Sequence, residues 1–298
     1  MYNTYMEKYV SHTSAAKMWD IPYFEAVFGR TEQTDSVDIT VSERKARYRT
    51  KNKKIHSSEL VLPVGAIRFH KGKMVASPEL LFLELASKLS IHRLILLGLQ
   101  LCSHPPGNPF EAITTKQKLN KFLEKTPGHI GHRKALRAAK YTENGSASIM
   151  ESLSYMILTL PHSLGGYGLN DAVFNYEVIV KSKASMSLGE VRCYTDLYYK
   201  HAKLAVEYES FAFHSSPSKL GKDALRSSLL ERQGVKVMHL STIQLYDRDA
   251  CRVFAFNLAA RLGKRLQIRA KSFDEKHALL RALLPVGKPV TELDGGEL

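Results

Sequence analysis

The segment KLAVEYES at residues 203–210 constrains the fold more strongly than any other part of the chain. Side chains of a β-strand point alternately to opposite faces, so Glu207 and Glu209 would share one face, about 7 Å apart along the strand. Glutamate is disfavoured inside strands and like charges on one face repel, so something should offset that cost. Either a divalent cation does so, since Mg²⁺ binds through one or two carboxylates plus water and phosphate oxygens, or both glutamates line an exposed sheet face and pair with lysines.

Two further acids are candidates for the same site. Asp196 ends the predicted strand RCYTD, and it would lie beside Glu207 if that strand forms a hairpin with the KLAVEYES strand through YYKHAK. Glu151 lies on a predicted helix before the sheet, flanked by apolar neighbours, from which it could reach a metal ion or its water shell. We therefore predict a site whose metal ligands are Asp196, Glu207 and Glu209.

Length and charge limit the class of protein. The chain has 298 residues, 44% of them hydrophobic, which is enough for a buried core and for two domains of ordinary size. Its 43 Lys and Arg exceed its 29 Asp and Glu, and the net charge of +14 indicates a polyanionic partner such as DNA, RNA or an anionic membrane face, unless the protein is simply basic. The membrane interpretation is weak, because the longest apolar run, 94–102, is far shorter than the roughly 20 residues that a spanning helix needs. A start without a secretory pattern and three widely spaced cysteines favour a reducing, cytoplasmic location.

The two halves of the chain differ in pattern, which suggests two folding units. The first half is predicted to hold strands within 37–76, leucine-rich helices over 78–101 and two short basic helices, with ENGSAS at 143–148 as a linker. The second half is predicted to run helix, three strands, helix, strand, helix, which favours an α/β fold with mixed strand pairing. The predicted divisions are a smaller α+β domain over 1–142, an α/β domain over 146–265, and a C-terminal helix and tail over 266–298 that is loose from 283 onward.

Two basic stretches are candidates for contact with phosphate. The segment RKARYRTKNKK at 44–54 is either an arm that faces nucleic acid or a solvated hairpin tip. A predicted helix after the carboxylate strand carries basic residues at i, i+3 and i+7, which fits phosphate-backbone contact or an ordinary solvated helix face. The candidate residues are Arg44, Lys45, Arg47 and Arg49 in the first stretch and Lys219, Lys222 and Arg226 in the second.

The second half also carries a spaced set of motifs, KLAVEYESFAFHSS followed by KDALRSSLLERQGVKVMHLS. Over about 146–247 the chain resembles the Vsr-like endonuclease domain, which belongs to the PD-(D/E)XK nuclease superfamily. The resemblance matches a helix glutamate, three acids, a histidine, a D-x-x-R motif and the leucine, glycine and valine after it: Glu151, Asp196, Glu207, Glu209, His214, Asp223, Arg226, Leu229, Gly234 and Val237. The sequence departs from the pattern in having Glu209-Ser210 in place of aspartate-glycine and in lacking the lysine of the (D/E)XK form.

The first half is similar to a second known region. The segments SHTSAAKMWDIP, VASPELLFLELASKLS and GHRKALRAA resemble the part that precedes a nuclease-like domain in bacterial proteins, which is related to the C-terminal part of AbiEi-type antitoxins. Those antitoxins usually begin with a DNA-binding winged helix, which we do not expect in this chain.

The resemblance implies a restriction-endonuclease-like mixed sheet flanked by helices, and hydrolysis of phosphodiester bonds by a metal-activated water, with Mg²⁺ or Mn²⁺ as the cofactor. It implies that Asp196 and Glu207 hold the metal, while Glu209 holds a second ion or orients the water. Glu151 would act through water in the outer shell, and His214 would donate to the leaving oxygen or contact a phosphate.

The expected function is therefore a metal-dependent endonuclease that acts on DNA. One alternative is a non-catalytic nucleic-acid-binding protein, antitoxin-like or regulatory, with a degenerate nuclease fold. Another is an adaptor that binds proteins through the leucine-rich stretch 78–101, although such a stretch is by default core. Cutting both strands of a duplex would favour a homodimer.

Overall fold

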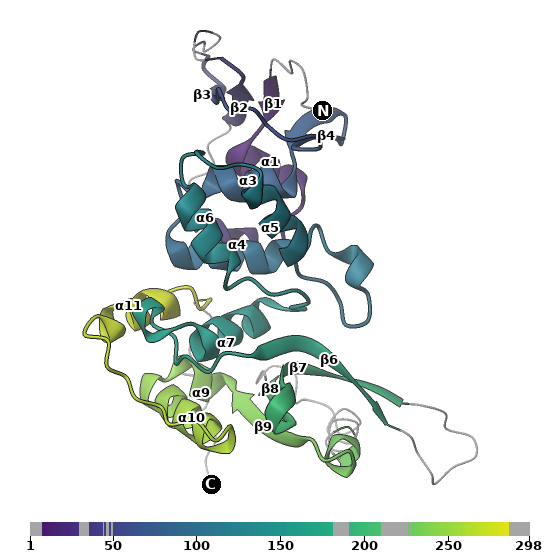
Figure 1. The fold of residues 1–298 in the computed structure, drawn as a ribbon, viewed down its shortest axis with the longest axis vertical. Coiled ribbons are helices and arrows are strands. Elements are labelled where there is room, and N and C mark those ends of the chain that lie inside the picture. The colour runs from purple at the N-terminus through teal and green to yellow at the C-terminus, as the bar shows by residue number, and fades with distance from the viewer. Residues whose placement is uncertain are drawn as a thin grey trace, which may run out of the picture.

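The computed structural model describes residues 8–29, 36–43, 45, 48, 50–180, 191–209, 226 and 228–285. Two β-sheets, each with helices against it, lie in the two halves of the chain, and both sheets mix parallel and antiparallel neighbours (Figure 1). The predicted α/β class with mixed strand pairing is confirmed at this level.

The first sheet has strand order β3-β2-β1-β5-β4. Its strands are β1 (Lys8–Val10), β2 (Val37–Val41), β3 (Lys53–Ser57), β4 (Ile67–His70) and β5 (Lys73–Ala76). Helices α1 (His12–Met18) and α2 (Phe24–Phe28) follow β1 in the chain. The strand-rich interpretation of 37–76 is confirmed. The parallel pairing of β1 with β5 joins the β3-β2 part of the sheet to the β5-β4 part.

The leucine-rich stretch forms two helices, α3 (Pro78–Leu85) and α4 (Ile91–Leu101). Each begins after a serine whose hydroxyl accepts a backbone N–H of the first turn, Ser77 for α3 and Ser90 for α4. All of α3 and most of α4 are buried, which confirms that this stretch is core. The short helix η2 (Pro109–Glu111) and helices α5 (Lys116–Glu124) and α6 (His132–Ala139) follow.

The second sheet has strand order β6-β7-β8-β9, with β8 and β9 parallel and the other neighbours antiparallel. Its strands are β6 (Ala172–Val180), β7 (Val191–Tyr199), β8 (Leu204–Glu209) and β9 (Lys236–Ser241). The other elements of this half are α7 (Ile149–Thr159), η3 (His162–Leu164), η4 (Lys200–Ala202), α9 (Thr242–Tyr246), α10 (Arg248–Arg261) and α11 (Phe273–Arg281).

The two halves pack against each other through α4 and α7. In Figure 1 the helices α3 to α6 lie between the first sheet and α7, and the second sheet lies beyond α7. The side-chain amide of Gln100 donates to Ser152 Oγ at 2.9 Å, and one buried apolar cluster runs through both halves. The predicted linker at 143–148 is a packed connection, because Ser146 is fully buried and Gly145 N donates to Cys102 O at 3.0 Å.

The expectation of a loose tail from residue 283 is wrong where the structure describes it. Leu283 and Leu284 are buried in the core cluster beside α11, and His277 Nδ1 makes a hydrogen bond of 2.7 Å with the carbonyl of Gly165. Apolar burial therefore continues to Leu284, the residue before the last described one. Among the described residues, no helix combines the length and the apolar character needed to cross a membrane.

Candidate functional site

The predicted hairpin between β7 and β8 brings two acids together. The two strands pair through Leu197 and Val206, and the next position on each strand is an acid, Asp196 on β7 and Glu207 on β8. Next to this pair, the Asp196 side chain accepts a main-chain hydrogen bond, from the backbone N–H of Tyr208 to Asp196 Oδ2 at 2.8 Å. The carboxylate that the sequence placed at the strand end is thus held by a main-chain donor.

Glu207 is buried and has one charged partner. Its Oε2 accepts from Arg226 Nη2 at 2.9 Å, and the same guanidinium group donates to the carbonyl of Tyr194. Its Oε1 is buried without a hydrogen-bond partner in the part of the chain that the structure describes. Burial raises the pKa of Glu207 to about 8; the neighbouring Asp196 also raises it, and Arg226 lowers it.

Burial also raises the pKa of Asp196, although the Tyr208 N–H, the charge of Arg226 and the neighbouring Glu207 side chain lower it. Two carboxyl groups this close in a poorly solvated place cannot both ionise easily without a further positive charge. The geometry therefore resembles a shared-proton pair, or a pair that would accept a cation.

Glu151 extends the acidic group from the helix below the sheet. It stands in the first turn of α7, where its Oε2 accepts from Ala147 N at 2.8 Å and from Asn175 Nδ2 at 3.1 Å. The pKa of Glu151 is raised to about 7, first by burial and then by the charge of Asp196. The charge of Glu151 also raises the pKa of Glu207, so the three acids are electrostatically coupled.

Glu209 lies apart from this group in its contacts. It is paired with His239 of β9, with 2.6 Å between Glu209 Oε1 and His239 Nδ1, and both side chains are substantially exposed. Strands β8 and β9 are parallel and place Glu207 opposite His239, so Glu209 reaches its partner diagonally. His239, which the sequence favoured as a core or sheet-edge residue, is accordingly an exposed ion-pair partner on the edge strand β9.

The predicted phosphate contacts are only partly described. Lys45 is exposed, and Arg226 turns its guanidinium group toward Glu207. The other predicted positions lie outside the described residues: Arg44, Arg47, Arg49, His214, Lys219, Lys222 and Asp223.

Sequence reasoning missed Asn175, which the structure places beside Glu151. Asn175 is a left-handed residue in β6, with φ of 43°, and its amide contacts both Glu151 and the carbonyl of Gly145. The only local signal is a single polar residue in the apolar run AVFNYEVIV, which by itself is ambiguous.

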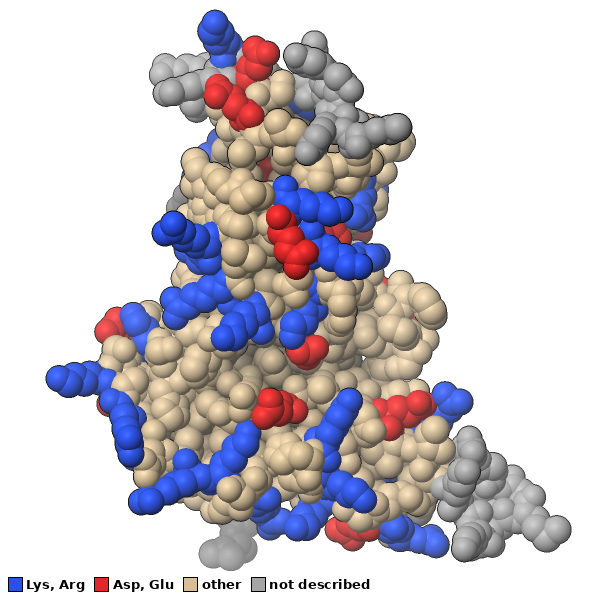
Figure 2. All heavy atoms as spheres, in the orientation of Figure 1, with Lys and Arg blue, Asp and Glu red and all other residues tan. Residues whose placement is uncertain are grey.

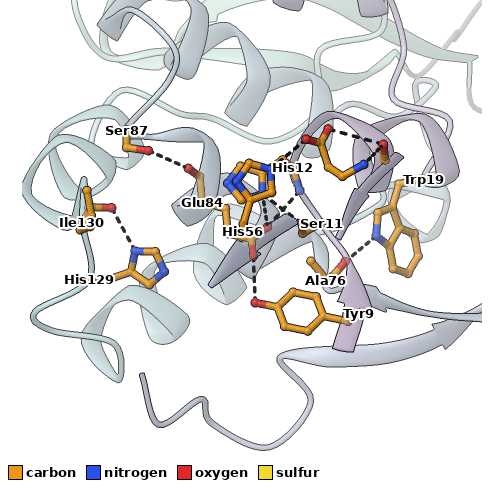
Figure 3. A network of polar contacts seen from close by, with 12 residues as sticks. Tyr9, Ser11, His12, Trp19, His56, Ala76, Glu84, Ser87, His129 and Ile130 are labelled. Carbon is orange, nitrogen blue, oxygen red and sulfur yellow. Dashed lines mark hydrogen bonds and ion pairs between the residues drawn. The ribbon is translucent and has the colours of Figure 1, made fainter. Parts of the chain in front are cut away.

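A second polar network, in the first half, was also missed (Figure 3). Buried Glu84 of α3 accepts from Tyr9 Oη at 2.9 Å and from His12 N at 3.1 Å. The ring of His12 stacks on His56 of β3 with 3.8 Å between centroids, and His56 Nε2 pairs with Asp38 Oδ1 at 2.9 Å. Burial raises the pKa of Glu84 to about 7 and lowers that of His12 to about 3.

The donor set of the carboxylate site fits a hard divalent cation. Asp196 and Glu207 offer the oxygen ligands that Mg²⁺ and Mn²⁺ prefer, and Glu207 Oε1 is the buried oxygen left without a described partner. Among the described residues no group of three or more His, Cys, Asp and Glu side chains is arranged to hold a metal. Two carboxylates would leave the remaining positions to water and phosphate oxygens, as is usual for Mg²⁺.

Comparison of the chain with protein-family models, with curated proteins and with solved structures finds no match. The geometry of the site therefore carries the functional argument.

Proposed function

We propose that this protein is a metal-dependent endonuclease that hydrolyses phosphodiester bonds of nucleic acid, with DNA as the expected substrate. The observation that carries the proposal is the pair Asp196 and Glu207, which lie side by side at the end of a strand pairing with raised pKa values, Glu207 buried and Asp196 half-buried. A purely structural sheet has little reason to place two acids together in such an environment. The proposal includes a restriction-endonuclease-like arrangement for the second sheet and its helices.

Each acid has a separate part in the proposed reaction. Asp196 and Glu207 would hold one Mg²⁺ or Mn²⁺ ion, and the Tyr208 N–H keeps the Asp196 carboxylate in place. The cation would polarise the scissile phosphate and lower the pKa of a coordinated water. Glu151, whose pKa lies near neutrality, would accept or return a proton at the edge of the site. Arg226 pairs with Glu207, and with a cation held there it would be available to a phosphate oxygen.

The charge of the chain supports a polyanionic substrate. Lys and Arg exceed Asp and Glu by 43 to 29, and on the face drawn in Figure 2 basic side chains spread over both halves of the molecule. Such a distribution favours contact with a phosphate backbone, and it predicts binding that weakens steeply as salt concentration rises.

The test is a cleavage assay on plasmid, single-stranded DNA and RNA with Mg²⁺ or Mn²⁺. Asp196→Asn and Glu207→Gln remove one charge each without changing shape, and Glu177→Gln is the matched control, because Glu177 contacts Arg192 and Tyr194 instead of the acid pair. We expect metal-dependent cutting that Asp196→Asn and Glu207→Gln each reduce at least about 100-fold and that Glu177→Gln retains. Absence of cutting by the unchanged protein with every substrate and both metals would refute the proposal.

A specific observation favours a second function. Arg226 already pairs with Glu207, and His239 already pairs with Glu209, so two of the three predicted ligands already contact a basic side chain of the protein. The second candidate is a non-catalytic nucleic-acid-binding protein, antitoxin-like or regulatory, in which Arg226 permanently replaces the cation. This candidate predicts salt-sensitive DNA binding with no calorimetric signal on addition of Mn²⁺.

A further inference from the structure

We propose that Asn175 is a positioning residue of the carboxylate site, whose side-chain amide holds Glu151 so that one of its oxygens faces the acid pair. This inference rests on the proposed function and deepens it. It assigns a role to a residue of β6, a strand that contributed nothing to the predicted site.

The backbone of β6 is built around Asn175. The β6–β7 register pairs Phe174 with Leu197 and Tyr176 with Thr195, and it leaves Asn175 unpaired across from Asp196. With φ of 43°, Asn175 adopts the left-handed conformation that asparagine tolerates better than most residues. The asparagine that interrupts the ladder therefore lies directly opposite the aspartate of the pair.

The left-handed residue also changes which face the strand buries. Phe174 packs with Leu197 in the large core cluster, whereas Val178 packs with Cys193 in a second, smaller cluster. Positions 174 and 178 would share one face of a regular strand. The strand therefore changes the face that it buries at Asn175, and the Asn175 side chain belongs to neither apolar cluster.

The side-chain amide of Asn175 makes hydrogen bonds with two other segments. Its Nδ2 donates to the carbonyl of Gly145 at 2.5 Å and to Glu151 Oε2 at 3.1 Å. Gly145 belongs to the packed connection between the halves, and Glu151 belongs to α7. Both N–H groups of the Asn175 amide therefore make hydrogen bonds, and together they fix Glu151 of α7 relative to the sheet.

The carboxyl group of Glu151 is held from two sides. Its Oε2 accepts from Ala147 N and from Asn175 Nδ2, and the side chain of Ser148 also hydrogen-bonds to the carboxyl group. Ala147 and Ser148 lie at the start of α7 itself, whereas Asn175 comes from the sheet, so its bond fixes the carboxyl group relative to β6. This bond would leave Oε1 to a coordinated water or a leaving oxygen.

The test separates the amide from the backbone. Asn175→Gly keeps access to positive φ and removes the amide, and Asn175→Asp keeps the shape but sets an acceptor against Glu151. Asp171→Gly is the matched control, since Asp171 is also left-handed, with φ of 77°, and its exposed carboxylate pairs with Lys264.

We expect Asn175→Gly to lower kcat about 10- to 100-fold with little change in KM and in the thermal midpoint, because a misplaced proton-transfer group slows chemistry more than it weakens binding. Asn175→Asp should be slower still, because it sets a second carboxylate against Glu151 in place of a donor. Asp171→Gly should leave kcat unchanged. Normal kcat in Asn175→Gly would overturn the positioning role.

A measurement without metal or substrate keeps the two proposals distinguishable. The Glu151 carboxyl carbon, followed by NMR in protein labelled at glutamate, should change its chemical shift in Asn175→Gly and keep it in Asp171→Gly. An unchanged Glu151 resonance in Asn175→Gly overturns the positioning inference whatever the activity of the protein. Failure of the unchanged protein to cut any substrate overturns the proposed function, and with it the catalytic meaning of the positioning.

Discussion

Arg226 donates to one oxygen of Glu207 at 2.9 Å, while the other oxygen of the same carboxylate is buried with no partner in the described structure. The described protein therefore supplies a hydrogen-bond partner for one of the two Glu207 oxygens. An unpaired buried oxygen is costly, and a nearby guanidinium group compensates only one of the two acids. Binding of a divalent cation by Asp196 and Glu207 therefore distinguishes the nuclease proposal from the regulatory alternative.

Removal of the guanidinium group should strengthen cation binding. In Arg226→Gln, Glu207 loses the positive charge that competes for its Oε2, so we expect the Kd for Mn²⁺ to fall about tenfold, which corresponds to roughly 1.4 kcal/mol. Isothermal titration calorimetry measures the change. Arg192→Gln is the control, because Arg192 pairs with Glu177 on an exposed part of the sheet. Weaker Mn²⁺ binding in Arg226→Gln would mean that Arg226 supports the ion.

The stability of the metal-free protein should fall as pH rises from 6 to 9. The folded-state pKa of Glu207 is raised to about 8 and that of Glu151 to about 7, so the folded chain keeps protons that the unfolded chain releases. This contribution is complete below the unfolded pKa of about 4.5 and is lost as pH rises through the folded values. We expect a loss on the order of 1–3 kcal/mol, measured by urea unfolding at several pH values.

Two comparisons make that pH experiment specific. Glu207→Gln should flatten the decline between pH 7 and 8, because the contribution of Glu207 changes up to its folded pKa of about 8 and the variant has no carboxyl group to ionise there. Mn²⁺ should stabilise the unchanged protein more at pH 8.5 than at pH 6, because it binds the ionised carboxylates. Equal Mn²⁺ stabilisation at both pH values would exclude the acid pair as the ligand.

Local sequence pattern was enough to find the acid pair. The alternation in β8 placed Glu207 on a strand, and the short connection before it made a hairpin with Asp196 the simplest arrangement. Alternation cannot distinguish a ligand from an ion-pair partner, however. His239 reaches Glu209 because β9 returns parallel to β8, and Arg226 reaches Glu207 from a helical segment; neither neighbour is visible in the spacing of residues.

The polar network of the first half lay beyond sequence reasoning for the same reason. Its members come one at a time from different elements, Tyr9 from β1, His12 from α1, Asp38 from β2, His56 from β3 and Glu84 from α3. Tertiary packing brings them together, and no motif marks them. Similarly, nothing in α3 distinguishes Glu84 from the exposed glutamates that amphipathic helices usually carry.

That network should give the first half its own pH dependence. Glu84→Gln keeps the Oε1 acceptor for Tyr9 but sets an amide against the His12 N–H, so we expect a loss of about 1 kcal/mol at pH 5.5. The folded pKa of Glu84 is raised to about 7, so the unchanged protein loses stability through that pH, and the difference between the two proteins should shrink by pH 8.5.

Urea unfolding at pH 5.5, 7 and 8.5, values chosen to span about one and a half pH units on either side of neutrality, measures this convergence. Glu124→Gln on the exposed face of α5 is the control and should show no pH-dependent difference. A constant gap between Glu84→Gln and the unchanged protein across this range would show that Glu84 stays in one ionisation state.

The contact between α4 and the end of α6 should tolerate no additional atom. A Cβ on Gly98 would lie 2.3 Å from Thr142 Oγ1 and 3.1 Å from the Phe82 ring, in a fully buried place. Alanine is better than glycine in a helix by about 1 kcal/mol, but we expect overpacking to reverse this, so that Gly98→Ala costs about 1–3 kcal/mol.

In a Thr142→Ala background the nearest atom is gone, and the cost of Gly98→Ala should fall by at least about 1 kcal/mol. Urea unfolding of the four proteins gives the coupling energy; additive effects would mean that α4 shifts to accommodate the methyl group, and with it the Gln100 amide that joins α4 to α7.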